Sequence, residues 1–439
     1  MNLTKTYFSP AKLFVITWSF ALVAAYLGSA NEVYRRYDVI ELTFTLEGVL
    51  WIYAAIGVFV LGTVAANRRL LVIQLPLTGQ YVPRDDREDW ESWKLVIGSI
   101  LAYIIGVGIV FLLVYWTLLA VREVGSLTAF VETMYQSWHS MRRLWPAQKP
   151  FTGARLLYTG LISIVIIGAS GMALTNQDRQ HLDGKGLYRS HRYWILLVLV
   201  GLLPLMMLPL LVSQRILLAT ALVGAITTYV MLSSRGIPVL YPVVGFIAGF
   251  GVWTAQEVVR AGFTSGTVFG SLVTGVERLL FYFTNNVGNL NRGVSFSTER
   301  SYGFESFGFI FEYLFISDTV RNLYFESFYS GLASYKAGGG FTALGVPYLD
   351  FGVFGLIIIF VWGYVSQAAY LTANRNVFGA QVYGLIAASI VLSWHTAIWT
   401  DPYFWFNIAF LVIFILIAPA VQLTRYRSRS DETNRHDAL

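Results

Sequence analysis

Basic side chains suited to phosphate chemistry are concentrated in one part of this sequence. Between residues 256 and 345 the apolar chain is interrupted, and the interval contains six of them: Arg260, Arg278, Arg292, Arg300, Arg321 and Lys336. The planar guanidinium group binds two phosphate oxygens at once and stays charged. A reaction that expels a pyrophosphate needs positive charge where negative charge develops. A lone interfacial arginine also serves as a lipid anchor, so that structural interpretation stays open.

Arg215 is placed differently from the other arginines. Two apolar stretches are separated only by Ser213, Gln214 and Arg215, which predicts a helical hairpin with a charged tip. A side chain at so short a connection cannot swing far away. Arg215 is therefore a stronger candidate for holding an anion than an arginine in a long loop.

Transfer to a hydroxyl group also needs a proton acceptor, which is a carboxylate or a histidine within hydrogen-bond reach. The acidic candidates on the same side are Glu299, Glu305, Glu312, Asp318, Glu326, Asp350 and Asp401. His395 is expected about one and a half turns inside the outer end of a membrane helix, where a histidine is a functional candidate. A packing histidine is an equally common interpretation, and the sequence does not choose among these groups.

Residues 268–293 combine a periodic apolar pattern with a run of amides. Val268, Leu272, Val276 and Leu279 recur every three to four residues, which predicts an amphipathic helix. Residues 282–293 follow, rich in asparagine and aromatic side chains, which are the usual contacts for sugar hydroxyls and ring faces. An ordered surface loop capped by asparagines is the alternative.

The composition requires a lipid environment. Hydrophobic residues make up 56% of the 439 residues and charged residues only 13%, about half the charged share of soluble domains. The chain has no cysteine, which excludes disulfides and thiol nucleophiles. Its net charge of +6 is spread among loops, so we expect anionic lipid or a pyrophosphate-bearing substrate as partner, and no nucleic acid. No Asp-x-Asp motif is present, and we predict no metal and no cofactor.

We predict an all-α polytopic membrane protein with about ten transmembrane helices. The apolar runs start near residues 11, 48, 95, 154, 193, 215, 237, 346, 378 and 404. The predicted parts are a membrane bundle of seven spans (1–255), an external loop with short amphipathic helices (256–345), three further spans (346–423) and a disordered tail (424–439). Short-loop lysine and arginine counts place both termini in the cytoplasm, and Arg215 on the same outer side as the long loop.

The order of three features resembles that of the Wzy-type oligosaccharide repeat-unit polymerases, which are relatives of the O-antigen ligases. The features are the Ser213-Gln214-Arg215 hairpin, the large outward loop, and residues 341–356, which read FTALGVPYLDFGVFGL. The resemblance covers roughly residues 195–370. It implies a GT-C-like fold in the plasma membrane and an inverting, metal-independent transfer that joins polyprenyl-pyrophosphate-linked repeat units into a surface polysaccharide.

The resemblance also implies a role for Arg215, and the other candidate residues follow from their chemistry and their position in the sequence. Arg215 matches the hairpin arginine that binds pyrophosphate. The predicted catalytic residues are Arg215, Arg292, Glu305, Asp350 and His395. The predicted substrate-binding residues are Arg278, Arg300, Asn289, Tyr282 and Tyr348.

Other partners and other functions follow from the same architecture. A chain-length regulator and a flippase are expected partner proteins. An O-antigen-ligase-like transferase shares the architecture. A lipid-linked oligosaccharide flippase or other transporter is the non-enzymatic alternative. Such a protein would carry charged residues deep within several spans. A purely structural subunit would give no reason for so many arginines in one loop.

Overall fold

The structure of the protein is a computed structural model. It describes residues 2–3, 5–33, 44–68, 87–136, 144–145, 147–150, 154–178, 187–212, 215–233, 237–238, 245, 249, 251, 268–297, 299–314, 317–335, 340–374 and 376–413. The predicted tail, residues 424–439, and most of the span expected to start near residue 237 lie outside the described residues.

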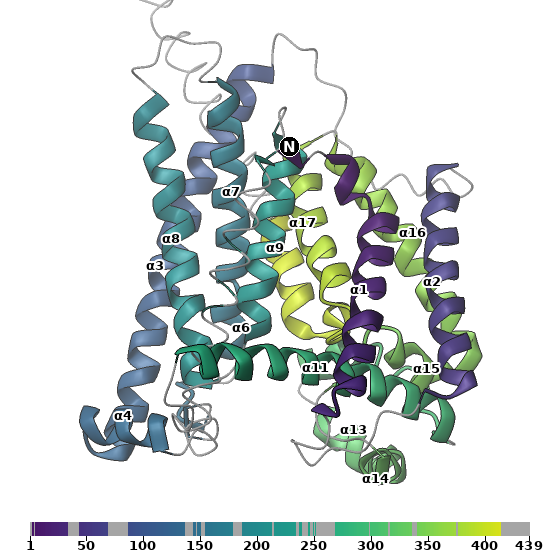
Figure 1. The fold of residues 1–439 in the computed structure, drawn as a ribbon. Helices are drawn as coiled ribbons and strands as arrows, with labels where there is room; N and C mark the ends of the chain where they lie inside the picture. The colour runs from purple at the N-terminus through teal and green to yellow at the C-terminus, as the bar shows by residue number, and fades with distance from the viewer. Residues whose placement is uncertain are drawn as a thin grey trace, which may run out of the picture.

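The described residues form helices almost throughout (Figure 1). The longer helices are α1 (Pro10–Ala30), α2 (Leu46–Asn67), α3 (Arg87–Val124), α7 (Leu161–Asp178), α8 (Leu187–Val212), α9 (Arg215–Leu232), α11 (Val268–Phe296), α16 (Gly355–Ala373) and α17 (Val377–Val391). The shorter ones are η1 (Lys5–Phe8), α4 (Leu127–Gln136), α6 (Ala154–Thr159), α12 (Gly308–Tyr313), α13 (Ser317–Tyr324), α14 (Glu326–Tyr335), α15 (Gly345–Phe351), η4 (Gly352–Phe354), η5 (Ile398–Thr400) and Pro402–Ile413. The predicted all-α class is confirmed.

Six helices of the described residues are long and apolar enough to cross a membrane. They are Pro10–Ala30, Leu46–Asn67, Ala102–Val124, Leu156–Thr175, Arg215–Leu232 and Gly345–Ala373. Three shorter apolar helices, Arg192–Met206, Val377–Val391 and Pro402–Ile413, lie where further spans are predicted. Ile237 and Pro238, at the predicted start of the seventh span, instead pair as strand β2 (Ile237–Pro238) with β1 (Asn2–Leu3). The chain is a helical membrane protein, and the count of ten spans stays a prediction.

Glycines let two of the long helices approach closely. A Cβ atom at Gly62 of α2 would lie 2.2 Å from the carbonyl oxygen of Phe360. A Cβ atom at Gly363 of α16 would lie 2.2 Å from the carbonyl oxygen of Phe59. Small residues at such crossings bring backbones together, which is how helices associate in lipid, where no hydrophobic force drives them.

Buried polar side chains also join the spans. Asn407 Oδ1 accepts hydrogen bonds from the Ser163 backbone N–H at 3.1 Å and from its hydroxyl at 2.6 Å. Gln381 of α17 donates to the hydroxyl of Ser170 in α7 at 3.0 Å. Ser163 lies in the first turn of α7, where a backbone N–H has no partner within the helix. Asn407 therefore acts as a cap for α7 from another segment of the chain.

Helix α11 lies crosswise under the lower end of the bundle in Figure 1, while the long apolar helices stand upright. It packs on α1 and α2: the Thr284 hydroxyl donates to the Ala25 carbonyl at 3.3 Å, and Asn291 Oδ1 accepts from the Thr45 N–H at 3.2 Å. The helix predicted from the apolar pattern is confirmed. It also continues through the asparagine-rich run, whose residues 283–294 are buried, so that run is not a surface loop.

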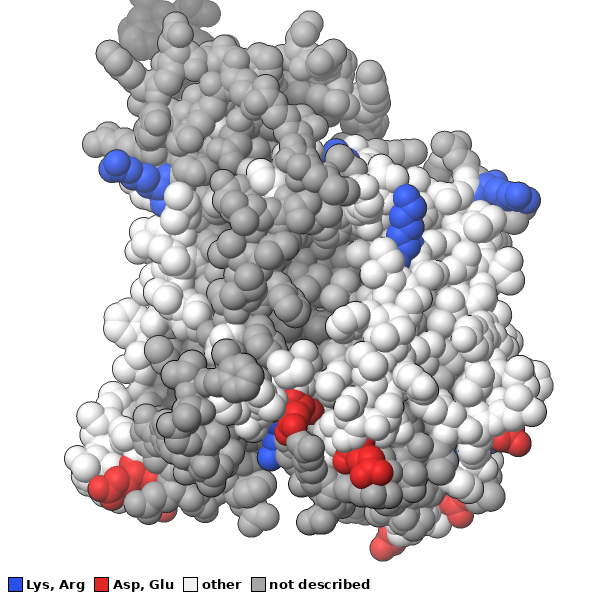
Figure 2. Space-filling model, viewed as in Figure 1, with Lys and Arg blue, Asp and Glu red and all other residues white. Residues whose placement is uncertain are grey.

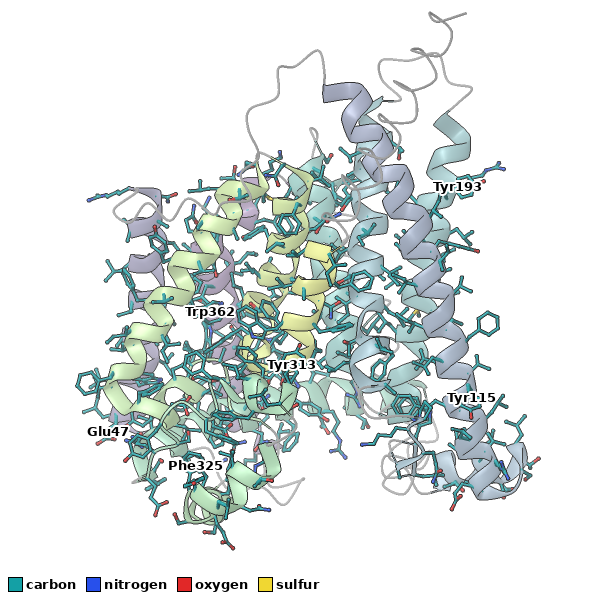
Figure 3. All side chains as sticks on the ribbon, turned by 180° about the vertical axis from the view of Figure 1, so that it is seen from behind. Glu47, Tyr115, Tyr193, Tyr313, Phe325 and Trp362 are labelled. Atoms are coloured by element: carbon teal, nitrogen blue, oxygen red, sulfur yellow. The ribbon has the colours of Figure 1, made fainter. Side chains whose placement is uncertain are left out.

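The surface is consistent with a lipid-facing belt. On the face shown in Figure 2, described Lys and Arg side chains lie mostly toward the upper end and Asp and Glu side chains toward the lower end. Most of the described residues in the wide band between the ends carry no charge on this face. In Figure 3, Tyr115 and Tyr193 point outward from the bundle, and they are 54% and 66% exposed, whereas Trp362 is enclosed. Large apolar side chains exposed on such a band have a natural partner in lipid.

Candidate functional site

The site is built on one face of α11. Six residues at spacings of three and four share this face of the helix, because a helical turn takes 3.6 residues. They are Arg278, Tyr282, Asn285, Asn286, Asn289 and Arg292. Asn286 and Asn289 are fully buried and Arg292 is 4% exposed. A polar stripe that is buried rather than turned to water must be satisfied by other parts of the protein or by a ligand.

Arg292 is held at the C-terminal end of this stripe. Its Nη2 donates to Asn289 Oδ1 at 2.9 Å, one helical turn earlier. Asn289 Nδ2 in turn donates to the carbonyl of Gly340 at 3.4 Å. Burial lowers the pKa of the Arg292 guanidinium, although an arginine stays protonated at neutral pH. The bidentate fork of Arg292 is thus oriented by a fixed amide rather than left to move.

Arg215 approaches the same stripe from α9, of which it is the first residue. Its guanidinium carbon lies 6.0 Å from the ring centroid of Tyr282. The Tyr282 ring is 6.1 Å from the His395 ring. The predicted hairpin arginine therefore lies at the same end of the bundle as α11 (Figure 1).

His395 lies in a turn after α17, not within a span. The sequence pattern placed it inside the ninth span, and this is wrong because α17 ends at Val391 and residues 392–395 form turns. Its Nδ1 is 2.9 Å from Asn286 Nδ2. Burial, and secondarily the charge of Arg215, lower the pKa of His395 to about 4. The imidazole is therefore neutral at physiological pH, with its lone pair on the ring nitrogen that carries no proton.

Neighbouring backbone segments fix the position of His395. Its preceding residue, Trp394, stacks on Phe283 of α11 with ring centroids 3.7 Å apart. Ala343 N–H donates to the Ser393 carbonyl at 2.8 Å, which ties the turn to the segment before α15. Gly340 lies so close that a Cβ atom there would be 3.4 Å from the His395 carbonyl oxygen.

We refer to the residues joined by these contacts as the α11 polar cluster. It comprises Arg215, Tyr282, Asn286, Asn289, Arg292 and His395. Five of the ten residues predicted from the sequence are in it. Asn286 was not among those ten, although its spacing of four from Tyr282 and three from Asn289 was visible in the sequence.

Asp350 has partners elsewhere. One carboxylate oxygen accepts from the Ser301 hydroxyl and from the Glu305 N–H at 3.1 Å, and the other accepts from the Ser306 N–H at 2.7 Å. The turn it holds contains Tyr302 at φ 47° and Gly303 at φ 95°. This arrangement is a cap on a tight turn that precedes Asp350 in the sequence.

The remaining predicted residues lie around this turn and along α11. The Glu305 carboxylate accepts from the Tyr329 hydroxyl. Arg300 donates to the Ser297 carbonyl at 2.9 Å and lies 4.9 Å over the ring of Tyr348, so these two predicted binding residues form a pair of their own. Arg278 lies one turn before Tyr282 on the polar face of α11.

The chemistry open to the α11 polar cluster is set by its side chains. It combines two guanidinium groups, a neutral imidazole, a phenol and buried amides. Within the described part of the chain, no group of three or more His, Cys, Asp or Glu residues is placed to hold a metal ion. Such a set suits an anionic ligand that also carries hydroxyl groups.

Comparisons of the chain with protein-family models, curated proteins and solved structures each gave no match. The fold and the site define the class of the protein: it is a polytopic α-helical membrane protein with a buried, arginine-containing polar cluster at one end of its helical bundle.

Proposed function

We propose that this protein is an oligosaccharide repeat-unit polymerase. It would transfer a growing glycan from one polyprenyl pyrophosphate to a terminal sugar of another carrier-linked repeat unit, without metal. The observation that carries the proposal is the convergence of Arg215, Arg292 and His395 on one buried face of α11. The resemblance to Wzy-type polymerases, with its implied GT-C-like fold, supports the same function.

The arginines act on the leaving group. The bond between the anomeric carbon of the donor sugar and the pyrophosphate oxygen breaks, and its electron pair leaves with the pyrophosphate. Arg215 and Arg292 neutralise the charge that develops, and they do so most effectively in a site with little water. Asn289 keeps the Arg292 fork oriented while this happens.

His395 acts on the acceptor. It takes the proton of the acceptor hydroxyl as that oxygen bonds to the anomeric carbon from the opposite face, which inverts the configuration. The charge of Arg215 adds to burial in lowering the pKa of His395, which weakens it as a base before the donor binds. A bound pyrophosphate offsets that charge and raises the pKa again. Proton removal is thereby strongest when the donor is in place. The predicted catalytic roles of Glu305 and Asp350 stay predictions.

The surroundings support a location at a membrane face. The proposed location is the plasma membrane, with α11 on the outer side and both termini cytoplasmic. The positive upper end and the acidic lower end in Figure 2 support that orientation. A chain-length regulator and a flippase are the proposed protein partners.

The distribution of charge does not favour a transporter. In the candidate spans that the structure describes, ionisable Asp, Glu, Lys and Arg residues lie near the ends, for example Lys12, Glu47 and Arg122. A transport path for a charged lipid would need such groups at mid-depth. A ligase that uses a different acceptor shares every feature of the site, and the assay below separates the two by the acceptor that is used.

The experiment compares alanine variants of three arginines that lie at the same end of the helical bundle. Arg215→Ala and Arg292→Ala should each lower the rate of glycan lengthening by about 100- to 1,000-fold, as the loss of one transition-state donor does elsewhere. Arg321→Ala is the matched control, because Arg321 is exposed on α13 and lies over Tyr329, 4.8 Å away. Its rate should stay within about twofold of the parent protein, since surface changes away from a site have small effects.

Purified protein in lipid vesicles is given a carrier-linked repeat unit, with chelator and without nucleotide sugar, and product length is read on gels. Lengthening that stops on chelation, or normal lengthening by both cluster variants, contradicts the proposal. Protein abundance is measured alongside, so that a folding defect is not taken for a catalytic one.

A further inference from the structure

Asn286 has an unusual position within the α11 polar cluster. Its side chain is fully buried, and its amide nitrogen makes one hydrogen bond, 2.9 Å long, to His395 Nδ1. The other end of the amide, Oδ1, is enclosed and has no hydrogen-bond partner in the described part of the chain. A buried amide end without a partner costs free energy in a folded protein, so a bound ligand is the natural partner for it.

The hydrogen bond between Asn286 and His395 also determines where the histidine carries its proton. When the amide nitrogen donates to Nδ1, the neutral ring has its proton on Nε2, and Nε2 cannot accept another. Rotating the amide by half a turn places its oxygen against Nδ1. Nδ1 then carries the proton, and Nε2 is left with a lone pair. The two ends of one amide therefore select between two tautomers.

We propose that Asn286 is the positioning residue that turns His395 into a base when ligand binds. A ligand oxygen next to the rotated amide accepts a hydrogen bond from Asn286 Nδ2 and so stabilises the rotated form. In this form Asn286 Oδ1 accepts from His395 Nδ1–H. His395 Nε2 is then free to take the proton of the acceptor hydroxyl. This inference rests on the proposed function for its catalytic meaning. The ligand oxygen belongs either to the donor pyrophosphate or to a sugar hydroxyl.

In the described part of the chain, two charged or titratable side chains face the imidazole. The charged neighbour from α9 is Arg215, and the titratable neighbour from α11 is Tyr282. The adjacent Trp394 ring, 5.4 Å away, does not titrate. A change at Asn286 should therefore be visible in the protonation of His395 without interference from other groups on the same turn.

Nitrogen-15 NMR of the histidine rings tests the tautomer switch directly. The signal of His395 is identified by its loss in His395→Gln. In the parent protein, inorganic pyrophosphate or a methyl glycoside should move the proton from Nε2 to Nδ1. A response to the first probe identifies a phosphate oxygen as the contact, and a response to the second identifies a hydroxyl. Ring signals that respond to neither probe overturn the inference.

Asn286→Asp gives the second test. A carboxylate only accepts, so it should hold the proton on Nδ1 in the absence of ligand, and its charge should raise the pKa of His395 by about one to three units. The pH at which lengthening falls to half should rise by the same amount. Asn286→Leu should lengthen glycan about 100-fold more slowly, because the general base loses its orientation.

Asn291→Leu is the matched control on the same helix. Asn291 is equally buried, but its Oδ1 accepts from Thr45 at 3.2 Å on a different face of α11. This variant should keep the pH profile and histidine signals of the parent protein. An Asn286→Asp profile that coincides with the parent profile contradicts the inference, and so does an equal shift in Asn291→Leu. If the parent protein does not lengthen glycan, the proposed function is contradicted. The NMR result then still decides whether Asn286 sets the tautomer of His395.

Discussion

Asp350 offers the sharpest separation between a structural and a catalytic role. Asp350→Ala removes the acceptor of two buried donors, the Ser306 N–H and the Ser301 hydroxyl, and of the partly buried Glu305 N–H. Each of the two buried donors left without a partner costs about 1–3 kcal/mol. The two together destabilise the turn by about 2–6 kcal/mol. The turn has no easy way to relax, because Tyr302 and Gly303 already adopt positive φ angles of 47° and 95°.

Hydrogen–deuterium exchange in detergent measures this loss. The exchange of the amides of residues 301–306 should quicken by at least about 30-fold, since each 1.4 kcal/mol corresponds to a factor of ten. Asp350→Asn should give an intermediate effect, because it keeps one acceptor oxygen and turns the other into a donor. Glu326→Ala, an exposed acidic residue on α14, is the control and should leave exchange in the turn unchanged.

The activity of the same variants completes the test. Glycan lengthening by Asp350→Ala should decline only as far as the amount of folded protein declines. Normal exchange in the turn together with a loss of transfer would refute the capping argument and make Asp350 a catalytic residue.

Two predictions concern the packing of the bundle. Gly62→Leu should strongly lower the midpoint of thermal unfolding in detergent, because a Cβ atom at Gly62 would lie 2.2 Å from the Phe360 carbonyl oxygen. The control is Gly57→Leu on the same helix, which should leave the midpoint nearly unchanged because a Cβ atom there meets nothing within 4 Å. Equal midpoints for the two variants would contradict the close crossing of α2 and α16. Asn407→Leu should lower the free energy of unfolding by about 1–3 kcal/mol, because the N–H of Ser163 loses its acceptor. A midpoint of thermal unfolding equal to that of the parent protein would contradict the capping role of Asn407.

The membrane class could be predicted from composition because lipid is the only solvent that suits so apolar a surface. The helix from Val268 could also be predicted, since its apolar residues recur at helical spacing. The burial of its polar face could not be predicted in the same way. The residues next to Asn286 in the sequence do not indicate that its partner is His395, which is 109 residues away.

The same limit applies to Asp350 and to the position of His395. The partners of the Asp350 carboxylate are 44 to 49 residues earlier in the sequence, so only tertiary structure shows that it caps a turn. His395 was expected inside a helix because the span that starts near residue 378 was expected to continue about one and a half turns beyond it. The helix nevertheless ends at Val391, where the turn of His395 contacts the segment before α15.

The position of α11 also sets an order of events during synthesis of the chain. α11 rests on Ala25 and Thr45, which precede their α11 partners by 259 and 246 residues. At the usual speed of translation these segments wait roughly 10–50 seconds for α11. Asn286 then waits for His395 until a further 109 residues have been added. A chain released in that interval carries the arginines and amides of the site without its imidazole, so half-made copies in the membrane hold an incomplete polar cluster.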